Sequence, residues 1–88
     1  MFRLLFREAF GKSLSKLRDK EARGRVLGKI EELKERAPLG KKLFGYSYWS
    51  IHVGRLRVIY EMRRERGEIE IIELLERKRK YRELKRLK

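Results

Sequence analysis

The sequence predicts one small α+β domain over residues 1–88, with an N-terminal strand, a helical hairpin, a three-stranded antiparallel meander and a C-terminal helix. Three observations lead to this fold class. Apolar residues alternate in four short segments, as in strands with one buried face, and recur every three or four residues in other segments, as in helices. Turn signals separate these segments. A length of 88 residues suits one domain and is too short for two.

The N-terminal half is predicted to hold a strand and two helices. Apolar residues alternate over residues 2–6, so one face of this strand is expected to be buried. Ser13 is expected to cap the first helix, and Asp19 to open the second helix or a bend before it; that helix is predicted over 21–36. The apolar side of the second helix follows a helical spacing, with Ala22, Val26, Ile30, Leu33 and Ala37.

Two glycines lie four residues apart in the second helix. Because they lack side chains, Gly24 and Gly28 are expected to let this helix lie close to the first helix or to the sheet. The helix is expected to end before Pro38, since the residue that precedes a proline is disfavoured in the helical conformation. Residues 38–45 are then predicted to form a basic loop with two apolar side chains tucked beneath it.

The C-terminal half is predicted to form the meander and a final helix. Strict alternation predicts strands over 48–53 and 56–62, joined by a turn at Gly54-Arg55. A third strand is predicted over 68–75, where the alternation slips between two isoleucines and indicates a bulge or a strand covered on both faces. The basic segment 77–88 carries a narrow apolar stripe at helical spacing.

Charge is the most unusual property of the composition. The chain has 26 Lys and Arg against 13 Asp and Glu, and its net charge is +13. A thermophile-like surface would explain the many charges, but it would not explain a twofold excess of one sign. A basic surface that binds a polyanion explains both, and RNA is the polyanion that we expect.

Several classes of site are excluded or disfavoured by what the sequence contains. With one His and no Cys, the chain offers no zinc site built from His and Cys and no disulfide. It has no glycine-rich phosphate loop, so no cofactor and no metal are expected. It also has no apolar run of the roughly 18 residues that a membrane span needs. A cytoplasmic protein without a membrane partner is therefore expected.

The outer face of the meander is the candidate site. Strand 48–53 is expected to bury Trp49, Ile51 and Val53 and to expose Tyr48, Ser50 and His52. Arg57 is expected to face outward on the next strand, while Arg77 follows the last strand and Tyr81 lies one helical turn further on. A guanidinium group can donate two parallel hydrogen bonds to the oxygens of one phosphate, and aromatic rings stack on unpaired bases. This set of side chains therefore predicts a surface that binds phosphate and base.

Each of these side chains also has a purely structural interpretation. His52 is a lone strand histidine, which is commonly a surface or packed residue, and Tyr81 could anchor the last helix on the sheet. The basic residues of the C-terminal segment could form a general electrostatic surface without specific contacts. Both interpretations stay open on the residues alone.

Several motifs together resemble those of the RelE/ParE superfamily of type II toxin–antitoxin toxins. They are the stretch Lys41-Lys42-Leu43-Phe44-Gly45, the segment Gly54-Arg55-Leu56-Arg57-Val58-Ile59-Tyr60, the ending Arg77-x-x-x-Tyr81 and the helical hairpin over 16–38. The resemblance covers nearly the whole chain and rests on the order and spacing of these motifs.

The resemblance implies a toxin and two candidate activities. RelE-like members of the superfamily cleave mRNA in the ribosomal A site, ParE-like members inhibit DNA gyrase, and an antitoxin neutralises both. For this chain we expect a ribosome-dependent endoribonuclease, or mRNA interferase, that inhibits translation. A ParE-like gyrase inhibitor and a catalytically inactive RNA-binding member are the alternatives. The implied partners are an acidic, RelB-like antitoxin, the ribosome and mRNA.

The resemblance also assigns expected roles to individual residues. Arg57 and Arg77 match the phosphate-binding arginines of the RelE branch, and Tyr81 approximately matches its C-terminal tyrosine. His52 falls where RelE has a further basic residue, so His52 or a nearby lysine would assist proton transfer. The strand lysines of the family fall near two positions that are not basic here, Tyr48 and Ser50. Contacts to RNA or the ribosome are expected from Lys41, Lys42, Arg55, Arg79 and Lys80.

Overall fold

A computed structural model of the chain describes residues 1–43, 45 and 47–76. In chain order the elements are β1 (Arg3–Phe6), α1 (Glu8–Ser15), α2 (Lys20–Arg36), β2 (Lys41–Lys42), β3 (Tyr48–Val53), β4 (Leu56–Arg63), a short 3₁₀ turn (Arg64–Arg66) and β5 (Glu68–Glu76). The strands form one sheet in the order β1-β5-β4-β3-β2. β1 runs parallel to β5, and all other neighbouring strands are antiparallel.

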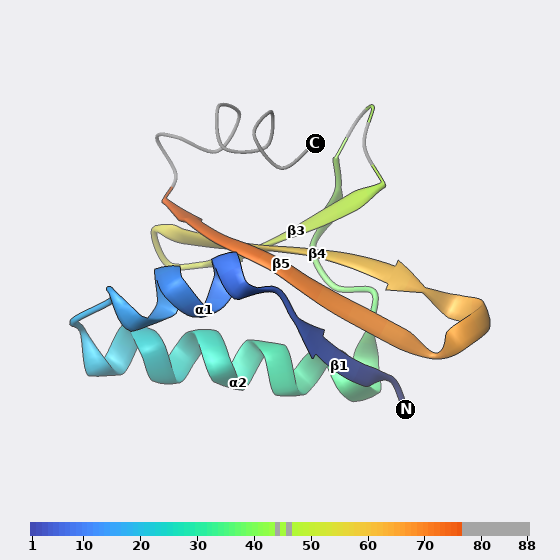
Figure 1. The fold of residues 1–88 in the computed structure, drawn as a ribbon, viewed down its shortest axis with the longest axis horizontal. Coiled ribbons are helices and arrows are strands. Elements are labelled where there is room, and N and C mark those ends of the chain that lie inside the picture. The colour runs from blue at the N-terminus through green and yellow to red at the C-terminus, as the bar shows by residue number, and fades with distance from the viewer. Residues whose placement is uncertain (44, 46, 77–88) are drawn as a thin grey trace.

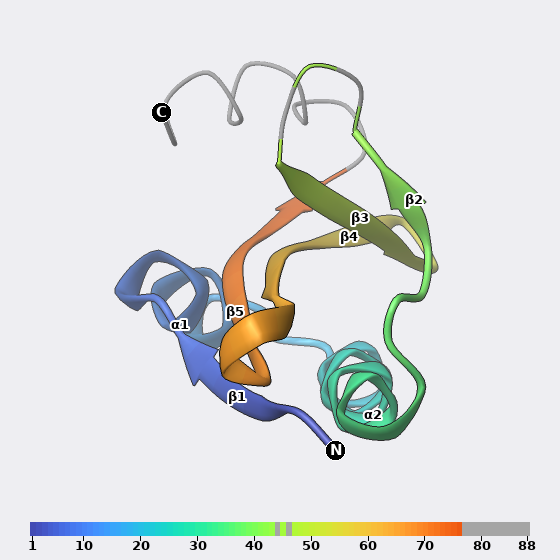
Figure 2. The ribbon, with the colours of Figure 1, turned by 90° about the vertical axis from the view of Figure 1, so that its right-hand side faces the viewer.

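Both helices lie on the same side of the twisted sheet (Figures 1 and 2). We call this side the helix face and the opposite side the far face. The predicted α+β class, the N-terminal strand, the helical hairpin and the three long antiparallel strands are confirmed. The predicted C-terminal helix, with Arg77 and Tyr81, lies outside the described residues.

Of the two predicted helix caps, Asp19 is confirmed and Ser13 is wrong. The Asp19 side chain caps α2 as predicted, accepting hydrogen bonds from the backbone N–H groups of Glu21 at 2.9 Å and Ala22 at 3.2 Å. Ser13 is not a cap, because α1 already begins at Glu8 and Ser13 lies in its last turn. The Ser13 hydroxyl instead donates to the Glu73 carboxylate on β5 at 2.6 Å and ties α1 to the sheet.

The main core lies between the helices and the helix face. Val26, Ile30 and Leu33 of α2 are buried there, as their spacing predicts. The sheet side of this core is formed by Ile51, Val53, Leu56, Val58, Tyr60, Ile69, Ile71 and Leu74. Gly24 and Gly28 were expected to allow close packing, but a methyl group at either position would meet no atom within 4 Å. Both face away from the core, so the close-approach prediction is wrong.

A second, smaller core lies on the far face. It consists of Tyr48, Ile59, Ile72 and Leu75, with Leu43 packed against it. The predicted slip in β5 explains it, because Ile59 pairs with Glu73 while Tyr60 pairs with Ile71, and Ile72 is left as the extra residue. The bulge turns the side chains of Ile72 and Leu75 to the far face. Tyr48 and Ser50 were predicted to be exposed, but packing of this core leaves them only 9% and 2% exposed.

The predicted loop over 38–45 contains a strand. Lys41 pairs with Ser50 and Lys42 with Trp49, so β2 extends the sheet beyond β3. Gly40 makes this possible, since it adopts a φ of 89° and passes so close to β3 that a Cβ atom would collide with the carbonyl oxygen of Ser50. The sheet therefore has five strands in place of the four that the sequence predicted.

One end of β1 is less buried than its alternation predicted. Phe2 and Leu4 pack against the main core, whereas Phe6 is 54% exposed. β1 is an edge strand, and α1 begins two residues after it, so Phe10 of α1 fills the buried position beside Phe6. The two rings lie 5.7 Å apart between centroids.

Candidate functional site

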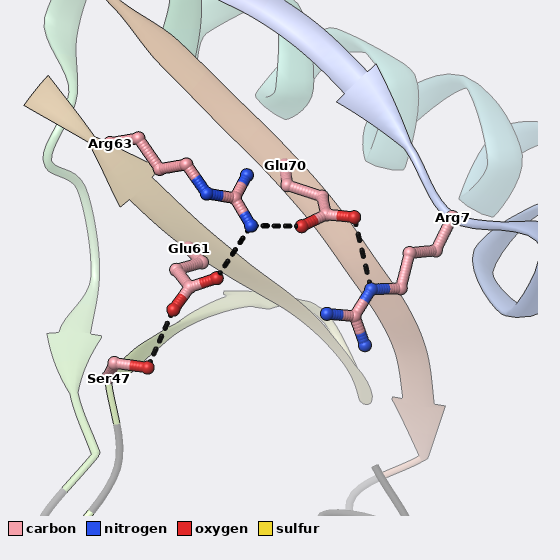
Figure 3. A network of polar contacts seen from close by, with 5 residues as sticks. All are labelled: Arg7, Ser47, Glu61, Arg63 and Glu70. Carbon is pink, nitrogen blue, oxygen red and sulfur yellow. Dashed lines mark hydrogen bonds and ion pairs between the residues drawn. The ribbon is translucent and has the colours of Figure 1, made fainter. Parts of the chain in front are cut away.

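One end of the far face is occupied by a network of ion pairs. Glu70 on β5 accepts from Arg7 at 3.1 Å and from Arg63 at 2.6 Å (Figure 3). Arg63 also donates to Glu61 at 3.1 Å, and Glu61 accepts from the Ser47 hydroxyl at 2.7 Å. The network connects the ends of β1, β5, β4 and β3, so Arg7 and Arg63 stabilise the sheet and are not available as unpaired phosphate ligands.

Ionisation of this network is strongly favoured. Burial alone would raise the pKa of Glu70, but the hydrogen bonds and charges of Arg63 and Arg7 outweigh burial and hold that pKa below its usual value. Burial alone would lower the pKa of Arg7. Glu70 and the Tyr48 side chain together raise this pKa by more than burial lowers it, so the net shift is upward. Charge is therefore balanced locally at this end of the far face.

The lowered pKa of Glu70 predicts a pH-dependent contribution to stability. A carboxylate with a depressed pKa stabilises the fold above its unfolded pKa, and this stabilisation is lost as pH falls through the folded value. Glu70→Gln is expected to lower the free energy of unfolding by about 1–2 kcal/mol at pH 7, because two charged hydrogen bonds are weakened. The difference from wild type should shrink steadily as pH falls below about 4.3, the usual value for Glu.

Urea unfolding at pH 7, 5 and 3 measures this effect. Glu32→Gln is the matched control, because the partly exposed Glu32 on α2 pairs, among the described residues, with Lys29 three residues away. This control is expected to change stability by less than about 0.5 kcal/mol at every pH. A Glu70→Gln deficit that stays constant down to pH 3 would contradict the assignment.

Arg57 lies at the other end of the far face and has a different environment. Its Nη1 donates to the Ser50 hydroxyl at a long 3.4 Å, and its buried Nε finds no acceptor. Within residues 1–43, 45 and 47–76, no carboxylate pairs with Arg57. Arg3, Arg7 and Arg63 all contact a glutamate, so Arg57 differs from them in having no carboxylate partner in the described part of the chain.

The strands place other predicted site residues near Arg57. His52 of β3 pairs directly with Arg57 of β4, and directly opposed side chains on one face lie about 4.5–5.5 Å apart between Cβ atoms. His52 is exposed, as predicted. β5 ends at Glu76, which pairs with Leu56, the residue before Arg57. The C-terminal end of β5 therefore lies beside Arg57.

The remaining predicted contacts are spread around this end of the sheet. Arg55 is exposed in the turn between β3 and β4, next to Gly54, whose φ is 62°. Lys41 and Lys42 are exposed on β2, on opposite faces of the sheet. Arg77, Arg79, Lys80 and Tyr81 lie outside the described residues.

Two features of the site were not visible to sequence reasoning. The sequence predicted Arg63 in a turn after the strand, whereas the structure places Arg63 on β4 with Arg57. No sequence signal indicates that Glu70 pairs with Arg63 and not with Arg57. Nor did the sequence place Lys41 on the sheet, because β2 consists of two lysines and shows no apolar alternation. Among the described residues, no group of His, Asp and Glu side chains could hold a metal ion. Neither described helix has the length and apolar character needed to cross a membrane.

Comparison with known proteins identifies the family. A family model described as the ParE toxin of the type II toxin–antitoxin system, parDE, matches residues 4–81. No curated protein sequence matches the chain. Among solved structures, the toxin–antitoxin complex RelB–RelE from Methanococcus jannaschii is 29% identical, with a TM-score of 0.73, and covers 90% of this chain and 96% of its own.

More distant structures share the fold. The isolated E. coli RelE toxin has a TM-score of 0.77 at 21% identity, with both chains fully covered. A chromosomal ParDE system from P. aeruginosa has a TM-score of 0.73 at 12% identity, covering 86% of this chain and 96% of that one. With the family match over residues 4–81, the resemblance first seen in the motifs is confirmed: the chain belongs to the RelE/ParE superfamily of type II toxin–antitoxin toxins.

Proposed function

We propose that this toxin is a ribosome-dependent endoribonuclease that cleaves mRNA in the ribosomal A site. The observation that carries the proposal is the environment of Arg57 on the far face. Arg57 has no carboxylate partner among the described residues, and its buried Nε donor has no acceptor. A planar fork of donors matches the geometry of a phosphate. The similarity to RelE structures, at 29% identity for the M. jannaschii complex, agrees with this proposal.

The reaction would be an internal transfer at phosphorus. The 2′-hydroxyl of a ribose attacks the adjacent phosphate, the bond from phosphorus to the 5′-oxygen of the next nucleotide breaks, and a 2′,3′-cyclic phosphate and a 5′-hydroxyl result. Arg57 and Arg77 hold the phosphate and neutralise the negative charge that grows on its oxygens in the transition state. Tyr81 stacks on or orients the nucleotide.

Proton transfer also needs side chains that act as base and acid. A base must take the proton of the 2′-hydroxyl, and an acid must protonate the departing 5′-oxygen. His52 is the titratable side chain directly opposite Arg57, so it is the first candidate for one of these roles. A neighbouring lysine is the second.

The net charge supports docking on the ribosome. Each phosphate that a Lys or Arg neutralises releases counterions, so a protein of net charge +13 gains affinity for ribosomal RNA, strongly at low salt. Lys42, Arg55, Arg79 and Lys80 would supply part of this general attraction.

Inhibition of DNA gyrase is the second candidate function, because the matching family model is that of the ParE toxin. A third is RNA binding without catalysis, because the family's strand lysines fall near Tyr48 and Ser50, neither of which is basic. One pair of assays separates the three. Purified protein is added to programmed ribosomes and, in parallel, to gyrase supercoiling reactions. Cuts within the A-site codon support the proposal, loss of supercoiling supports the second function, and neither result supports the third.

We also propose an acidic antitoxin as the cellular partner, as in the RelB–RelE complexes that the chain resembles. The far face around Arg57 is basic, and β1 and α2 leave Leu5, Phe6 and Leu27 exposed. A partly disordered acidic chain could cover both kinds of surface by folding as it binds.

Purification of the untagged protein from its native cells tests this partner. We expect a complex with an acidic protein that is partly disordered by circular dichroism when separated, and that suppresses the toxin's activity when added back. Recovery of the protein as a free monomer would contradict the proposal.

A further inference from the structure

The edge strand β2 brings a lysine to the site that sequence alone placed in a loop. Lys41 pairs in register with Ser50, and partners in an antiparallel pair point to the same face. Ser50 in turn accepts a hydrogen bond from Arg57, so its hydroxyl is on the far face. The strands therefore place Lys41, Ser50 and Arg57 in a row across β2, β3 and β4.

A second observation fixes the direction of Lys41 independently. Leu43, two residues later, packs against the far-face core of Tyr48, Ile59, Ile72 and Leu75. The hydrogen bond from the Leu43 N–H to the Tyr48 carbonyl, at 2.9 Å, continues the pairing of β2 with β3. Side chains two apart on a strand share a face, so Lys41 lies on the far face. Lys42 pairs with Trp49 of the main core and lies on the other side.

We propose that Lys41 and Arg57 form the two sides of a binding site for a phosphodiester group of single-stranded RNA, with Ser50 between them. The proposal rests on the ribonuclease function above and names the cation that replaces the family's missing strand lysines. Those lysines fall near Tyr48 and Ser50 of this chain, and neither side chain carries a positive charge. Lys41 reaches the same face from the neighbouring strand, so the charge is supplied from β2.

The site favours an anion because the Nε–H donor of Arg57 has no hydrogen-bond acceptor. A buried donor without an acceptor is unfavourable, and a phosphate oxygen bound to the guanidinium would recover part of that cost. Ser50 is only 2% exposed, so its hydroxyl contributes by accepting from Arg57 and holding the guanidinium in place. Lys41 is exposed and unpaired among the described ion pairs, so its ammonium group can approach the phosphate from the β2 side.

Neighbouring lysines provide a matched experiment. Single-turnover cleavage on programmed ribosomes is measured for Lys41→Ala and Lys42→Ala, which remove the same charge from opposite faces of one strand. We expect Lys41→Ala to slow cleavage roughly 100-fold, the lower end of the loss caused by removing one transition-state donor. Lys42→Ala should lose at most about threefold, as one general ribosome contact does. Lys41→Arg should retain most of the wild-type rate. Equal losses for the two alanine variants would overturn the proposal.

A binding measurement separates this site from the ribonuclease function. The Arg57 Nε–H resonance is followed by ¹⁵N NMR while inorganic phosphate, and then a 2′-O-methyl RNA trinucleotide that cannot be cleaved, is added. The site predicts a saturable shift that weakens at least fivefold in Lys41→Ala and little in Lys42→Ala. If this shift occurs in a protein that does not cut mRNA, the site stands and the ribonuclease proposal fails. If wild-type Arg57 does not respond to either probe, the site itself is wrong.

Discussion

Replacing Arg57 by Ala is expected to lower the rate of A-site cleavage by roughly 10²–10³, as removal of one oxyanion-stabilising donor does in other enzymes. Stability should fall by less than about 1 kcal/mol, because Arg57 contributes one long hydrogen bond and its stem covers part of the sheet. The reason for this imbalance is that Arg57 has no carboxylate partner among the described residues. Single-turnover cleavage and urea unfolding of the same preparation measure both effects.

Three other arginines serve as comparisons. Arg77→Ala should resemble Arg57→Ala, since both are proposed to hold the phosphate. Arg86→Ala removes a charge near the end of the chain and should weaken ribosome binding only slightly, with a smaller dependence on salt. Arg63→Ala should show the reverse behaviour, with lower stability because Glu70 and Glu61 lose a partner. Equal loss of cleavage in all four variants would mean that the charge acts only as a diffuse patch. Full activity of both Arg57→Ala and Arg77→Ala would exclude the proposed mechanism.

Gly40→Ala is expected to lower the free energy of unfolding by about 3 kcal/mol or more, the range of changes caused by steric strain at a special backbone position. Gly40 has a φ of 89°, which side chains disfavour, and its new Cβ atom would collide with the backbone of Ser50 and Ile51. Backbone atoms of a paired strand cannot move aside without breaking the β2–β3 pairing. Lys41 should then lose its place beside Ser50, so cleavage should fall as well.

Gly24→Ala is the matched control for this substitution. Gly24 lies within α2, has no positive φ, and would place its new methyl group in open space. Alanine is the better helix former, so this variant should be more stable than wild type by roughly 0.5–1 kcal/mol. Chemical denaturation of both variants gives the comparison. A Gly40→Ala protein as stable as wild type would show that the chain does not pass as close to β3 as described.

The elements that could be predicted from sequence are those whose buried residues recur at the regular spacing of a helix or a strand. Helix α2 has its buried residues at helical spacing and a capping aspartate, so its bounds were correct to one residue. Strands β3, β4 and β5 each bury most of one face, and the bulge in β5 appears as a slip in the alternation. In each case the signal is local, because one element determines its own pattern of exposure.

The features that could not be predicted depend on residues far apart in the chain. Strand β2 is two lysines long and has no period, so it is defined only by its pairing with β3. The Arg7–Glu70 contact spans 63 residues and requires β1 to run parallel to β5. The pairing of β1 with β5 brings Arg7 to Glu70, and the pairing of β4 with β5 brings Arg63 to it. Neither ion pair could be inferred before these pairings were known. The sequence therefore identified Arg57 as a candidate, and the fold leaves it without a carboxylate partner among the described residues.

The central claim is that this toxin promotes attack of a ribose 2′-hydroxyl on the adjacent phosphate of mRNA in the ribosome. The most direct test maps the ends of two messages after incubation with the protein on programmed ribosomes. One message carries an ordinary A-site codon, and the other carries a single 2′-deoxyribose at each position of that codon in turn. We predict cleavage within the ordinary codon, and its complete loss when the 2′-hydroxyl next to the cut is removed. An ordinary message that stays intact, or cleavage that persists at the same bond without its 2′-hydroxyl, would contradict the account.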